Sequence, residues 1–416
     1  MELTFGYGKE KIGLSVPDQN LLAVLTPNRV EYDLTGEAEV RRSLKNPIGA
    51  PRLSETVRPG QRVVIVTSDI TRPVPSYKIL PAILEELAGA GVEDRDITVV
   101  FALGSHRAHS EEDKKYLVGE AVYNRVRCID SDETDCVHMG ETPRGTPVDI
   151  FRPVAQADVR ICVGNIEYHY FAGYSGGAKA IMPGVATRAA IQSNHSRMVE
   201  AAACSGRIAG NPVREDIEDV AKLCPIDFIV NVVLNEKKEI IRCVSGHFIQ
   251  AHRAGCEFLD RLYKTEIPRP ADIVIVSPGG FPKDINMYQA QKALDNAKHA
   301  VRDGGCIIWL ASCREGLGGS TFEQWMTGHE KAGDMIEHIG REFQLGGHKA
   351  AAIAMVLARA RIFLVSDMDP DFVRSVHLEP FPSAEAALSE AFRAQGQEAS
   401  VIAMPYGGST LPVTAC

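Results

Sequence analysis

The residues with the clearest chemical potential lie in one short span that ends at His195. The span contains His169, the glycine-rich bend Gly173-Tyr-Ser-Gly-Gly-Ala-Lys179 and the pair Asn194-His195. Imidazoles can move protons or bind a metal, a lysine can act as a nucleophile or hold an anion, and glycines let the backbone approach a ligand closely. This combination predicts an enzyme that holds an anionic cofactor or substrate beside a metal or a proton relay.

Short apolar runs that predict β-strands alternate with helical stretches along most of the chain. The expected strands are residues 62–67, 97–103, 159–163, 273–277, 305–310, 361–365 and 400–404, and the expected helices include residues 76–91, residues 187–203 and one from Met287. Alternation of this kind predicts parallel sheet built from right-handed crossovers. Residues 21–32 are ambiguous and compatible with an antiparallel edge. The fold class is therefore α/β, with two domains of parallel or mixed sheets flanked by helices and an active site in the interdomain cleft.

The length of 416 residues exceeds one ordinary hydrophobic core. The proline-flanked break Ile267-Pro-Arg-Pro270 reads as the linker between the domains. We therefore expect an N-terminal domain over residues 1–266 that carries the cofactor and the catalytic histidines, completed by residues from about 398 to 416. Residues 271–397 then form a C-terminal domain that contributes substrate contacts.

Composition excludes several classes of partner. The net charge is −9 and no Lys/Arg-rich block occurs, which argues against nucleic acid or an anionic membrane surface. No apolar run is long enough to span a bilayer, and the first residues lack a signal-peptide pattern. The ten cysteines, scattered from Cys128 to Cys416, include no Cys-x-x-Cys pair, which favours reduced thiols in the cytoplasm.

Two polar loops follow the first two expected strands, where ligands of parallel sheets gather. In one, Asp69 and Arg72 lie among prolines. Arginine can bind a carboxylate or phosphate through two hydrogen bonds, although an internal Asp69–Arg72 pair would equally tie the loop down. In the other, His106 is placed to act as a general base, and with His109 it forms a His-x-x-His half of a zinc site. The alternative for this histidine is a structural hydrogen bond.

Two further segments carry lysines in suggestive contexts. The bend before Lys179 fails the phosphate-loop pattern because alanines flank the lysine, yet its backbone N–H groups could still hold an anion. The alternative there is a tight turn with a surface lysine. In the helix from Met287, Tyr288 and Lys292 are four residues apart and share one face, with Gln289 adjacent, unless this is only a solvated helix start.

Together these segments resemble the nickel-dependent lactate racemase family, whose members racemise or epimerise 2-hydroxy acids with a nickel-pincer nucleotide. The resemblance covers most of the chain in order, and its most specific segment is the one from His169 to Lys179 with the following His195. The matching segments are Ser68-Asp-Ile-Thr-Arg-Pro-Val-Pro75, Leu103-Gly-Ser-His-Arg107, His169-Tyr-Phe-Ala-Gly-Tyr-Ser-Gly-Gly-Ala-Lys179, Asn194-His195 and Tyr288-Gln-Ala-Gln-Lys292.

The resemblance implies a role for each matching residue. Lys179 would be linked covalently to the cofactor, a pyridinium-3,5-bisthiocarboxylic acid mononucleotide, and His195 would be the one protein ligand to nickel. His106 and His169 would be the paired proton donor and acceptor. The resemblance also implies cofactor contacts by Asp69, Ile70, Thr71, Arg72 and Tyr288, and substrate-carboxylate contacts by Arg72, Gln289 and Lys292.

The implied chemistry explains the need for two histidines. The α-hydrogen of a 2-hydroxy acid is difficult to remove as a proton beside an anionic carboxylate. Its removal as hydride, while one histidine takes the hydroxyl proton, yields a 2-keto acid that can be reduced again on its other face. Two bases on opposite sides of the carbon are therefore required. The implied partners are a small 2-hydroxy acid and the enzymes that synthesise the cofactor.

One departure bears on the substrate. The family pattern carries a tryptophan late in the C-terminal domain, whereas here the region reads Gly346-Gly-His348-Lys349 followed by alanines, with Trp309 and Trp325 elsewhere. We expect a 2-hydroxy acid that is larger or more polar than lactate, with His348 and Lys349 facing its distal groups or merely capping a helix. The alternatives are a lactate racemase proper, a zinc-dependent hydrolase using His106, His109 and His169, a nicotinamide dehydrogenase, or a non-catalytic binding module. The sequence does not reveal the oligomeric state.

Overall fold

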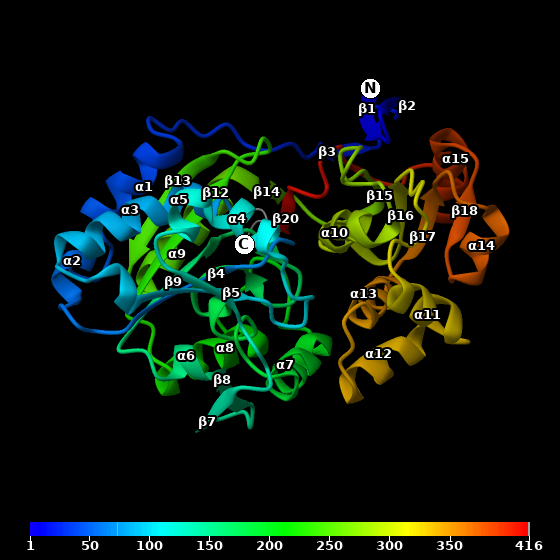
Figure 1. Ribbon diagram of the computed structural model, residues 1–416. Helices are drawn as coiled ribbons and strands as arrows, with labels where there is room; N and C mark the ends of the chain where they lie inside the picture. The colour runs from blue at the N-terminus through cyan, green and yellow to red at the C-terminus, as the bar shows by residue number, and fades with distance from the viewer. Residues whose placement is uncertain (73, 415–416) are drawn as a thin grey trace. The chain divides into compact units, whose positions relative to one another are not determined.

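The protein divides into two compact units, each of which is described by itself. The computed structural model describes residues 1–72 and 74–414, so Pro73, Ala415 and Cys416 lie outside the described residues. We call Val30–Asp260 the central unit, and Met1–Arg29 with Arg261–Cys416 the terminal unit, because the latter contains both ends of the chain (Figure 1).

A mixed six-stranded sheet forms the middle of the central unit, in the order β13-β12-β9-β4-β5-β6. Only β12 and β13 pair antiparallel; the other neighbours pair parallel. Central strands of such a sheet are buried on both faces, which is why their sequences are nearly continuous apolar runs. The strands are β4 (Val63–Ser68), β5 (Ile97–Ala102), β6 (Arg127–Asp130), β9 (Val159–Asn165), β12 (Phe228–Leu234) and β13 (Ile240–Gly246).

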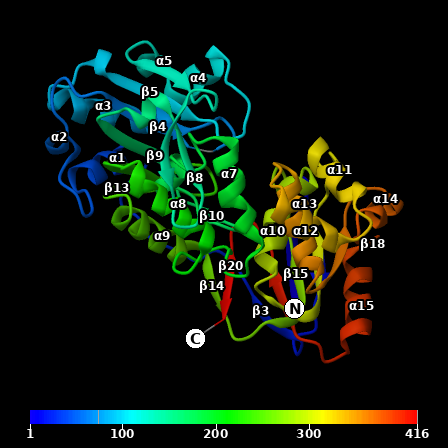
Figure 2. The ribbon, with the colours of Figure 1, turned by 90° about the horizontal axis from the view of Figure 1, so that it is seen from below.

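Helices cover both faces of this sheet. A core of apolar side chains joins one face to α1 (Gly36–Lys45), α2 (Leu53–Thr56), α3 (Ser76–Gly89), α4 (Glu111–Val118) and α5 (Glu120–Tyr123). Figures 1 and 2 show α7 and α8 on the other side from α1 and α3. The elements outside that core are α6 (Arg152–Ala155), α7 (Arg188–His195), α8 (Pro212–Leu223), α9 (Gln250–Tyr263), the hairpin β7 (Cys136–Glu141) and β8 (Pro147–Phe151), and the short pair β10 (Tyr168–His169) and β11 (Gly173–Tyr174).

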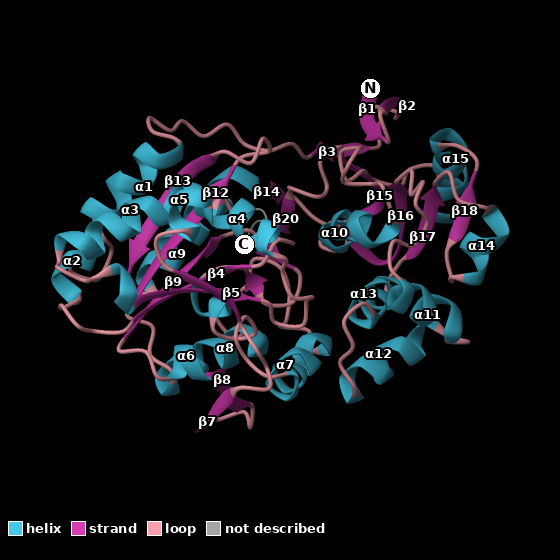
Figure 3. Cartoon of the chain, viewed as in Figure 1, coloured by secondary structure: helices cyan, strands magenta, loops and turns pink. Residues whose placement is uncertain are grey.

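The terminal unit contains a second six-stranded sheet in the order β18-β17-β16-β15-β19-β3, in which all neighbours pair parallel. The hairpin β1 (Glu2–Tyr7) and β2 (Glu10–Ser15) and helix α15 (Ala384–Gln395) share the core of one face. The sheet strands are β3 (Leu21–Val24), β15 (Ala271–Val276), β16 (Val301–Leu310), β17 (Arg361–Val365), β18 (Glu379–Phe381) and β19 (Val401–Met404). The remaining helices, drawn in Figure 3, are α10 (Met287–Ala297), α11 (Ser320–Gly328), α12 (Ala332–Arg341), α13 (Gly347–Leu357) and α14 (Pro370–Ser375).

The ends of the chain belong to a different unit from the one expected. The expected domains joined residues 1–266 with about 398–416, but β3 and β19 pair with each other, and β19 also pairs with β15. Strand β20 (Leu411–Thr414) likewise pairs with β14 (Lys264–Ile267). The edge strand expected to be antiparallel is therefore parallel. These pairings join segments hundreds of residues apart, and their apolar sequences suit either sheet.

The chain leaves and re-enters the terminal unit at adjacent points rather than at residues 267–270. The backbone N–H of Asn28 donates to the carbonyl of Leu262 at 2.8 Å. The side-chain amide of Asn28 donates to the carbonyls of Arg261 and Lys264 at 3.1 and 2.9 Å. The central unit is therefore one continuous insertion between two neighbouring strands of backbone.

Local signals for helices are confirmed in most places. Ser110 caps α4 by accepting from the backbone N–H of Asp113 at 3.1 Å, as its position before three acidic residues predicts. The helix expected over residues 187–203 is shorter: α7 ends at His195 and a 3-10 turn follows over Ser196–Val199. Among residues 1–72 and 74–414, no helix is long and apolar enough to cross a membrane.

Candidate active site

Three neighbouring parallel strands of the central unit place the candidate residues. Strand β4 lies between β5 and β9, and all three run in the same direction. The loops that follow them carry Asp69, His106 and His169. Because the carboxyl ends of parallel strands meet at one edge of the sheet, residues far apart in sequence converge there, as expected.

Asp69 and His106 form a close pair. Asp69 Oδ2 accepts from His106 Nδ1 at 2.5 Å, and Thr71 Oγ1 donates to Asp69 Oδ1 at 2.9 Å. Burial alone would raise the pKa of Asp69, but the hydrogen bond and charge of His106 lower it below its ordinary value. Since the carboxylate accepts, Nδ1 of His106 carries the proton and Nε2 remains to accept one. Asp69 therefore orients the imidazole of His106.

His109 supports this loop from behind and has no nitrogen left for a metal. Its Nδ1 contacts Asp130 Oδ1 at 2.8 Å, and its Nε2 accepts from the backbone N–H of Ile70 at 3.1 Å. Within the described residues, no three side chains of the His, Cys, Asp and Glu types come together as metal ligands. The zinc-hydrolase alternative, which needs His109, is therefore not favoured.

Arg72 does not close the loop through its side chain. Its backbone N–H donates to the carbonyl of Asp69 at 3.1 Å, and its exposed guanidinium forms no ion pair with Asp69 among the described contacts. The alternative of an internal Asp69–Arg72 pair is thus not what the loop contains. The guanidinium still lies near enough to contribute to lowering the pKa of His169 and of Lys179. Arg72 is therefore available to bind an anion beside these two residues.

The buried ring of Phe171 joins three of the predicted site residues. Its centroid lies 4.5 Å from the ring of His169 and 4.9 Å from the ring of His195, both edge to face. Lys179 Nζ lies 6.0 Å from the same centroid. Two imidazoles and an amine thus surround one apolar platform in the central unit.

His169 and Lys179 share an environment that disfavours positive charge. Burial, followed by the charges of Lys179, His195, Arg72 and Arg214, lowers the pKa of His169 well below its ordinary value. Burial, followed by Arg214 and Arg72, lowers the pKa of Lys179 well below its ordinary value as well. A lowered pKa makes the neutral amine, which is the nucleophilic form of lysine, easier to reach. The residue types therefore fit a lysine that bonds covalently to an electrophilic cofactor.

His195 is buried at the end of α7, and one of its nitrogens is committed. Its Nδ1 lies 2.8 Å from Asn194 Oδ1. Nε2 is then the nitrogen that suits a metal ion, since metal-binding histidines donate their other N–H to a neighbouring oxygen. The residue fits a single-histidine nickel ligand.

The glycines of the bend serve the protein interior rather than a ligand. Gly176 and Gly177 have φ values of 74° and 61°, and Cβ atoms there would lie 2.8 Å from Asn231 Oδ1 and 3.0 Å from the ring of His252. The N–H of Gly177 already donates to Asn231 Oδ1 at 2.7 Å. Of the backbone N–H groups of the bend that could hold an anion, the one of Gly177 is therefore already used by Asn231.

Arg214 holds the bend in place and was missed in the sequence. This fully buried guanidinium donates to the carbonyls of Ala172, at 3.1 Å, and of Tyr174, and it lies 3.5 Å from the carbonyl of Gly176. Burial lowers its pKa to about 10, so it remains charged near neutral pH. Asn211, the N-cap of α8, also donates to the carbonyl of Phe171 at 2.9 Å. Helix α8 thus fixes the backbone that carries the site.

The predicted substrate residues of α10 lie in the terminal unit. Asn286 caps the helix by accepting from the N–H of Gln289 at 3.0 Å. Gln289 and Lys292 are exposed, and Tyr288 is partly exposed. Their exposure fits either a solvated helix start or a contact with a small ligand. Asp284 is buried instead and accepts from the N–H groups of Gly8 and Ser312, at 2.7 and 3.2 Å, so its role is structural.

The segment from Gly346 is neither a loop nor an open space. His348 and Lys349 are buried in α13, where Lys349 Nζ donates to Gln291 Oε1 at 2.9 Å and lies 5.0 Å from the ring centroid of Tyr288. A Cβ on Gly347 would lie 2.3 Å from the indole of Trp325. A tryptophan from α11 therefore packs against this segment, and no open space remains beside Gly347.

The chain matches one protein family over nearly all its length. Residues 7–206 match the domain described as lactate racemase N-terminal domain, and residues 267–411 match the lactate racemase C-terminal domain. It is 33% identical to the lactate racemase of Lactiplantibacillus plantarum, over 96% of this chain and 97% of that protein. It is 32% identical to the lactate racemase of Thermoanaerobacterium thermosaccharolyticum, over 97% of each.

Solved structures agree with this relationship. The lactate racemase apoprotein from Thermoanaerobacterium thermosaccharolyticum superposes with a TM-score of 0.89 at 31% identity, covering 99% of this chain and all of that one. A Thermotoga maritima protein superposes with a TM-score of 0.64 at 19% identity, covering 92% of this chain and all of that one, and this supports the fold alone. The expected α/β class with parallel and mixed sheets is confirmed.

Proposed function

The chain belongs to the lactate racemase family, and from this premise we propose that it inverts the α-carbon of a 2-hydroxy acid with a nickel-pincer nucleotide joined to Lys179. Its family makes it an isomerase of the racemase type. The observation that carries the proposal is the placement of His169, Lys179 and His195 around Phe171.

The residues present fit the proposed cofactor. Burial and the charges of Arg214 and Arg72 lower the pKa of Lys179, which favours its nucleophilic form, and His195 has its Nδ1 committed to Asn194. When bound, nickel and the pincer nucleotide supply the acceptor and donor of a hydride at the α-carbon. Ile70, Thr71 and Tyr288 are proposed to contact the nucleotide. Asp69 contacts His106, so its part is to orient that histidine beside the cofactor loop.

His106 and His169 are proposed to move the hydroxyl proton, each serving one direction of inversion. His106 presents Nε2 because Asp69 accepts from its Nδ1. His169 accepts the N–H of Ala172 at Nδ1, at 3.2 Å, and its lowered pKa keeps the ring uncharged, so its proton lies on Nε2. In this state His169 is the hydrogen-bond donor of the pair and His106 is the acceptor, and the reverse direction needs the opposite protonation. Arg72, Gln289 and Lys292 are proposed to bind the substrate carboxylate, since each presents donors and none forms a described ion pair.

Lactate is the reference substrate because both curated relatives bear the name lactate racemase. A hydroxy acid with a polar distal group is the second candidate. Its support is the buried pair of Lys349 and Gln291. Lys349 Nζ donates to Gln291 Oε1, and Gln291 Nε2 has no hydrogen-bond partner among the described residues. We propose a location in the cytoplasm, where the enzymes that synthesise the cofactor would load it; the nine described cysteines form no disulfide.

The test is the chemical state of the protein after co-expression with cofactor-synthesis enzymes. The holoprotein should carry an adduct that maps to Lys179 and about one nickel per chain. Lys179→Ala should abolish the adduct, whereas Lys222→Ala, on the exposed side of α8, should keep it. Racemase activity that persists in Lys179→Ala would overturn the proposal.

Solvent isotope incorporation tests the route of the α-hydrogen. Turnover of lactate in deuterium oxide should place little deuterium at the α-carbon if the hydrogen moves as hydride. Direct proton abstraction by His106 or His169 would place about one deuterium per inversion. Extensive incorporation, with cofactor exchange excluded by a control without substrate turnover, would contradict hydride transfer.

A further inference from the structure

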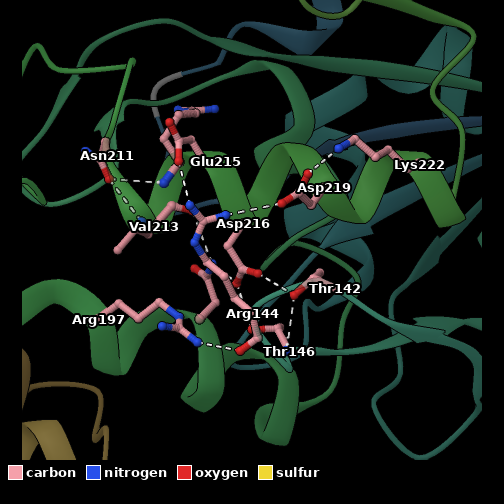
Figure 4. Close-up of polar contacts among 12 residues, drawn as sticks. Thr142, Arg144, Thr146, Arg197, Asn211, Val213, Glu215, Asp216, Asp219 and Lys222 are labelled. Carbon is pink, nitrogen blue, oxygen red and sulfur yellow. Dashed lines mark hydrogen bonds and ion pairs between the residues drawn. The ribbon is translucent and has the colours of Figure 1, made fainter.

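A buried carboxylate lies two hydrogen bonds away from His195. Asp216, on α8, has no exposed surface, and its two oxygens meet three side-chain donors from other elements. Two of them are Thr142 and Thr146, from the turn of the β7–β8 hairpin, which Figure 4 shows beside Asp216. The third is Asn194, next to His195 in the chain.

The direction of each hydrogen bond follows from the donors and acceptors available. Thr142 Oγ1 accepts from the N–H of Thr146 at 3.1 Å, so its own hydrogen goes to Asp216 Oδ1 at 2.5 Å. Thr146 Oγ1 and Asn194 Nδ2 lie 2.7 and 2.8 Å from Asp216 Oδ2. A carboxylate only accepts, so three donors meet three acceptor positions without conflict.

This arrangement fixes the amide of Asn194. Its Nδ2 faces two groups that only accept, the carboxylate of Asp216 and the carbonyl of Val213, at 2.8 and 3.2 Å. A flipped amide would set its oxygen against both acceptors, at a site where Asn194 and Asp216 are fully buried. Asn194 Oδ1 must therefore face His195 Nδ1, and that nitrogen must carry the imidazole proton.

We propose that Asp216 is a positioning residue that, through Asn194, holds His195 in the Nδ1–H tautomer and presents the lone pair of Nε2 to nickel. The inference rests on the proposed function only for the identity of the metal. An imidazole with its proton on Nε2 cannot ligate through that atom, so the fraction of His195 in the Nδ1–H tautomer sets how strongly the site binds metal. Supporting residues of this kind typically contribute about 10- to 100-fold in metal affinity.

The conservative variant Asp216→Asn breaks the network while keeping its shape. An asparagine offers one acceptor oxygen and one donor nitrogen, and its NH₂ group can face either the hydroxyl of Thr142 or the amide of Asn194, so the orientation of Asn194 is no longer fixed. Asn194→Ala removes the link itself and leaves Asp216 with both threonines. Thr142→Val is the matched control, because it removes one donor from Asp216 Oδ1 without touching Asn194.

The first measurement needs no metal. In apoprotein labelled with ¹⁵N-histidine, His195 is assigned by its disappearance in His195→Gln, and its ring shifts report the tautomer. Wild type and Thr142→Val should show the Nδ1–H form, whereas Asp216→Asn and Asn194→Ala should show a mixture with the Nε2–H form. A wild-type His195 in the Nε2–H form would overturn the proposal whatever the metal.

The second measurement is the rate of nickel loss from the holoprotein to EDTA. Asp216→Asn and Asn194→Ala should lose nickel about 10-fold faster than wild type, and Thr142→Val should not, even if its melting temperature falls equally. Equal nickel loss in Thr142→Val and Asp216→Asn would reduce Asp216 to a packing role. If Asp216→Asn does not fold, Asn194→Ala decides. Nickel retained in His195→Gln would instead refute the proposed function, while the tautomer result still tests the network.

Discussion

The surroundings of His106 and His169 differ sharply, although both histidines follow strands of the same sheet. His106 is hydrogen-bonded to the carboxylate of Asp69. His169 lies among Lys179, Arg72 and Arg214, and its ring meets Phe171 rather than an acid. A reaction that inverts a centre needs two bases on opposite faces, but the bases need not be alike. The surroundings of His169, where burial and neighbouring charges lower the pKa of Lys179, also suit the proposed covalent anchor.

The largest effect should come from removing either histidine. His106→Ala and His169→Ala should each lower kcat by about 10²- to 10⁴-fold in both directions, because each acts as base in one direction and acid in the other. Chiral chromatography of lactate from either enantiomer measures this. His138→Ala, on an exposed histidine of β7, is the control and should retain activity. The kcat/KM values of the two directions are linked by the equilibrium constant. A variant that seems to lose kcat/KM in one direction only would therefore indicate an assay artefact.

Asp69→Asn should have the next largest effect and should act only through His106. The amide can hold His106 with the wrong tautomer, so kcat should fall by about 10²-fold or more with little change in KM. In the background of His106→Ala the same substitution should cost nothing further. Equal losses in both backgrounds would mean that Asp69 contacts the cofactor directly instead.

Arg214→Lys should disturb the surroundings of His169 and Lys179, because Arg214 holds the backbone segment between these two residues. One ammonium cannot replace a guanidinium that donates to the carbonyls of Ala172 and Tyr174, so the free energy of unfolding should fall by about 2–4 kcal/mol. Denaturant unfolding of apoprotein measures the loss. The Lys179 adduct should also form more slowly, because the lysine is no longer placed by a fixed bend. An unchanged unfolding midpoint would contradict this role.

The smallest effect should be on the pH dependence of the stability of the apoprotein, to which His169 and Asp69 contribute in different pH ranges. The pKa of His169 is lower in the folded chain than its ordinary value of about 6.5, so the unfolded chain binds more protons and stability is lost as pH falls below about 6.5. The pKa of Asp69 is also lowered, so its contribution is present above about 3.9 and is lost only in stronger acid. His169→Asn should flatten the pH dependence of apoprotein stability between about pH 5 and 6.5, while Asp69→Asn should leave that range unchanged.

Sequence reasoning found β4, β5 and β9 and the residues at their ends because those signals are local, but it did not predict β6, β12 and β13 of the same sheet. An apolar run followed by Asp69, His106 or His169 is visible without knowledge of the fold. The partner of a side chain is not: the Asp69–His106 contact joins loops 37 residues apart, and its alternative, a local pair with Arg72, looked equally good. The same limit misplaced β3 and β19, which find each other only in the folded sheet.

The sequence signal for the supporting residues of α8, which are Asn211, Arg214 and Asp216, is weaker but detectable. Asn211-Pro212 is a helix-start signal, and Arg214 and Asp216 interrupt an apolar stripe that includes Val213 and Ile217. Charged residues on a buried helix face usually have a specific partner. No local sequence pattern predicts the contact between Trp325 and Gly347, because the two residues belong to different helices.

The hydrogen bond between Asn28 and Leu262 has a consequence for biosynthesis. During translation, the whole central unit emerges from the ribosome before β15 to β20 have been made, while β3 waits for β19, its neighbour in the parallel sheet. The central unit can therefore fold on the nascent chain, whereas the terminal unit can close only after the last strands are released. Residues 30–260 expressed alone should accordingly fold more readily than a chain truncated before residue 400.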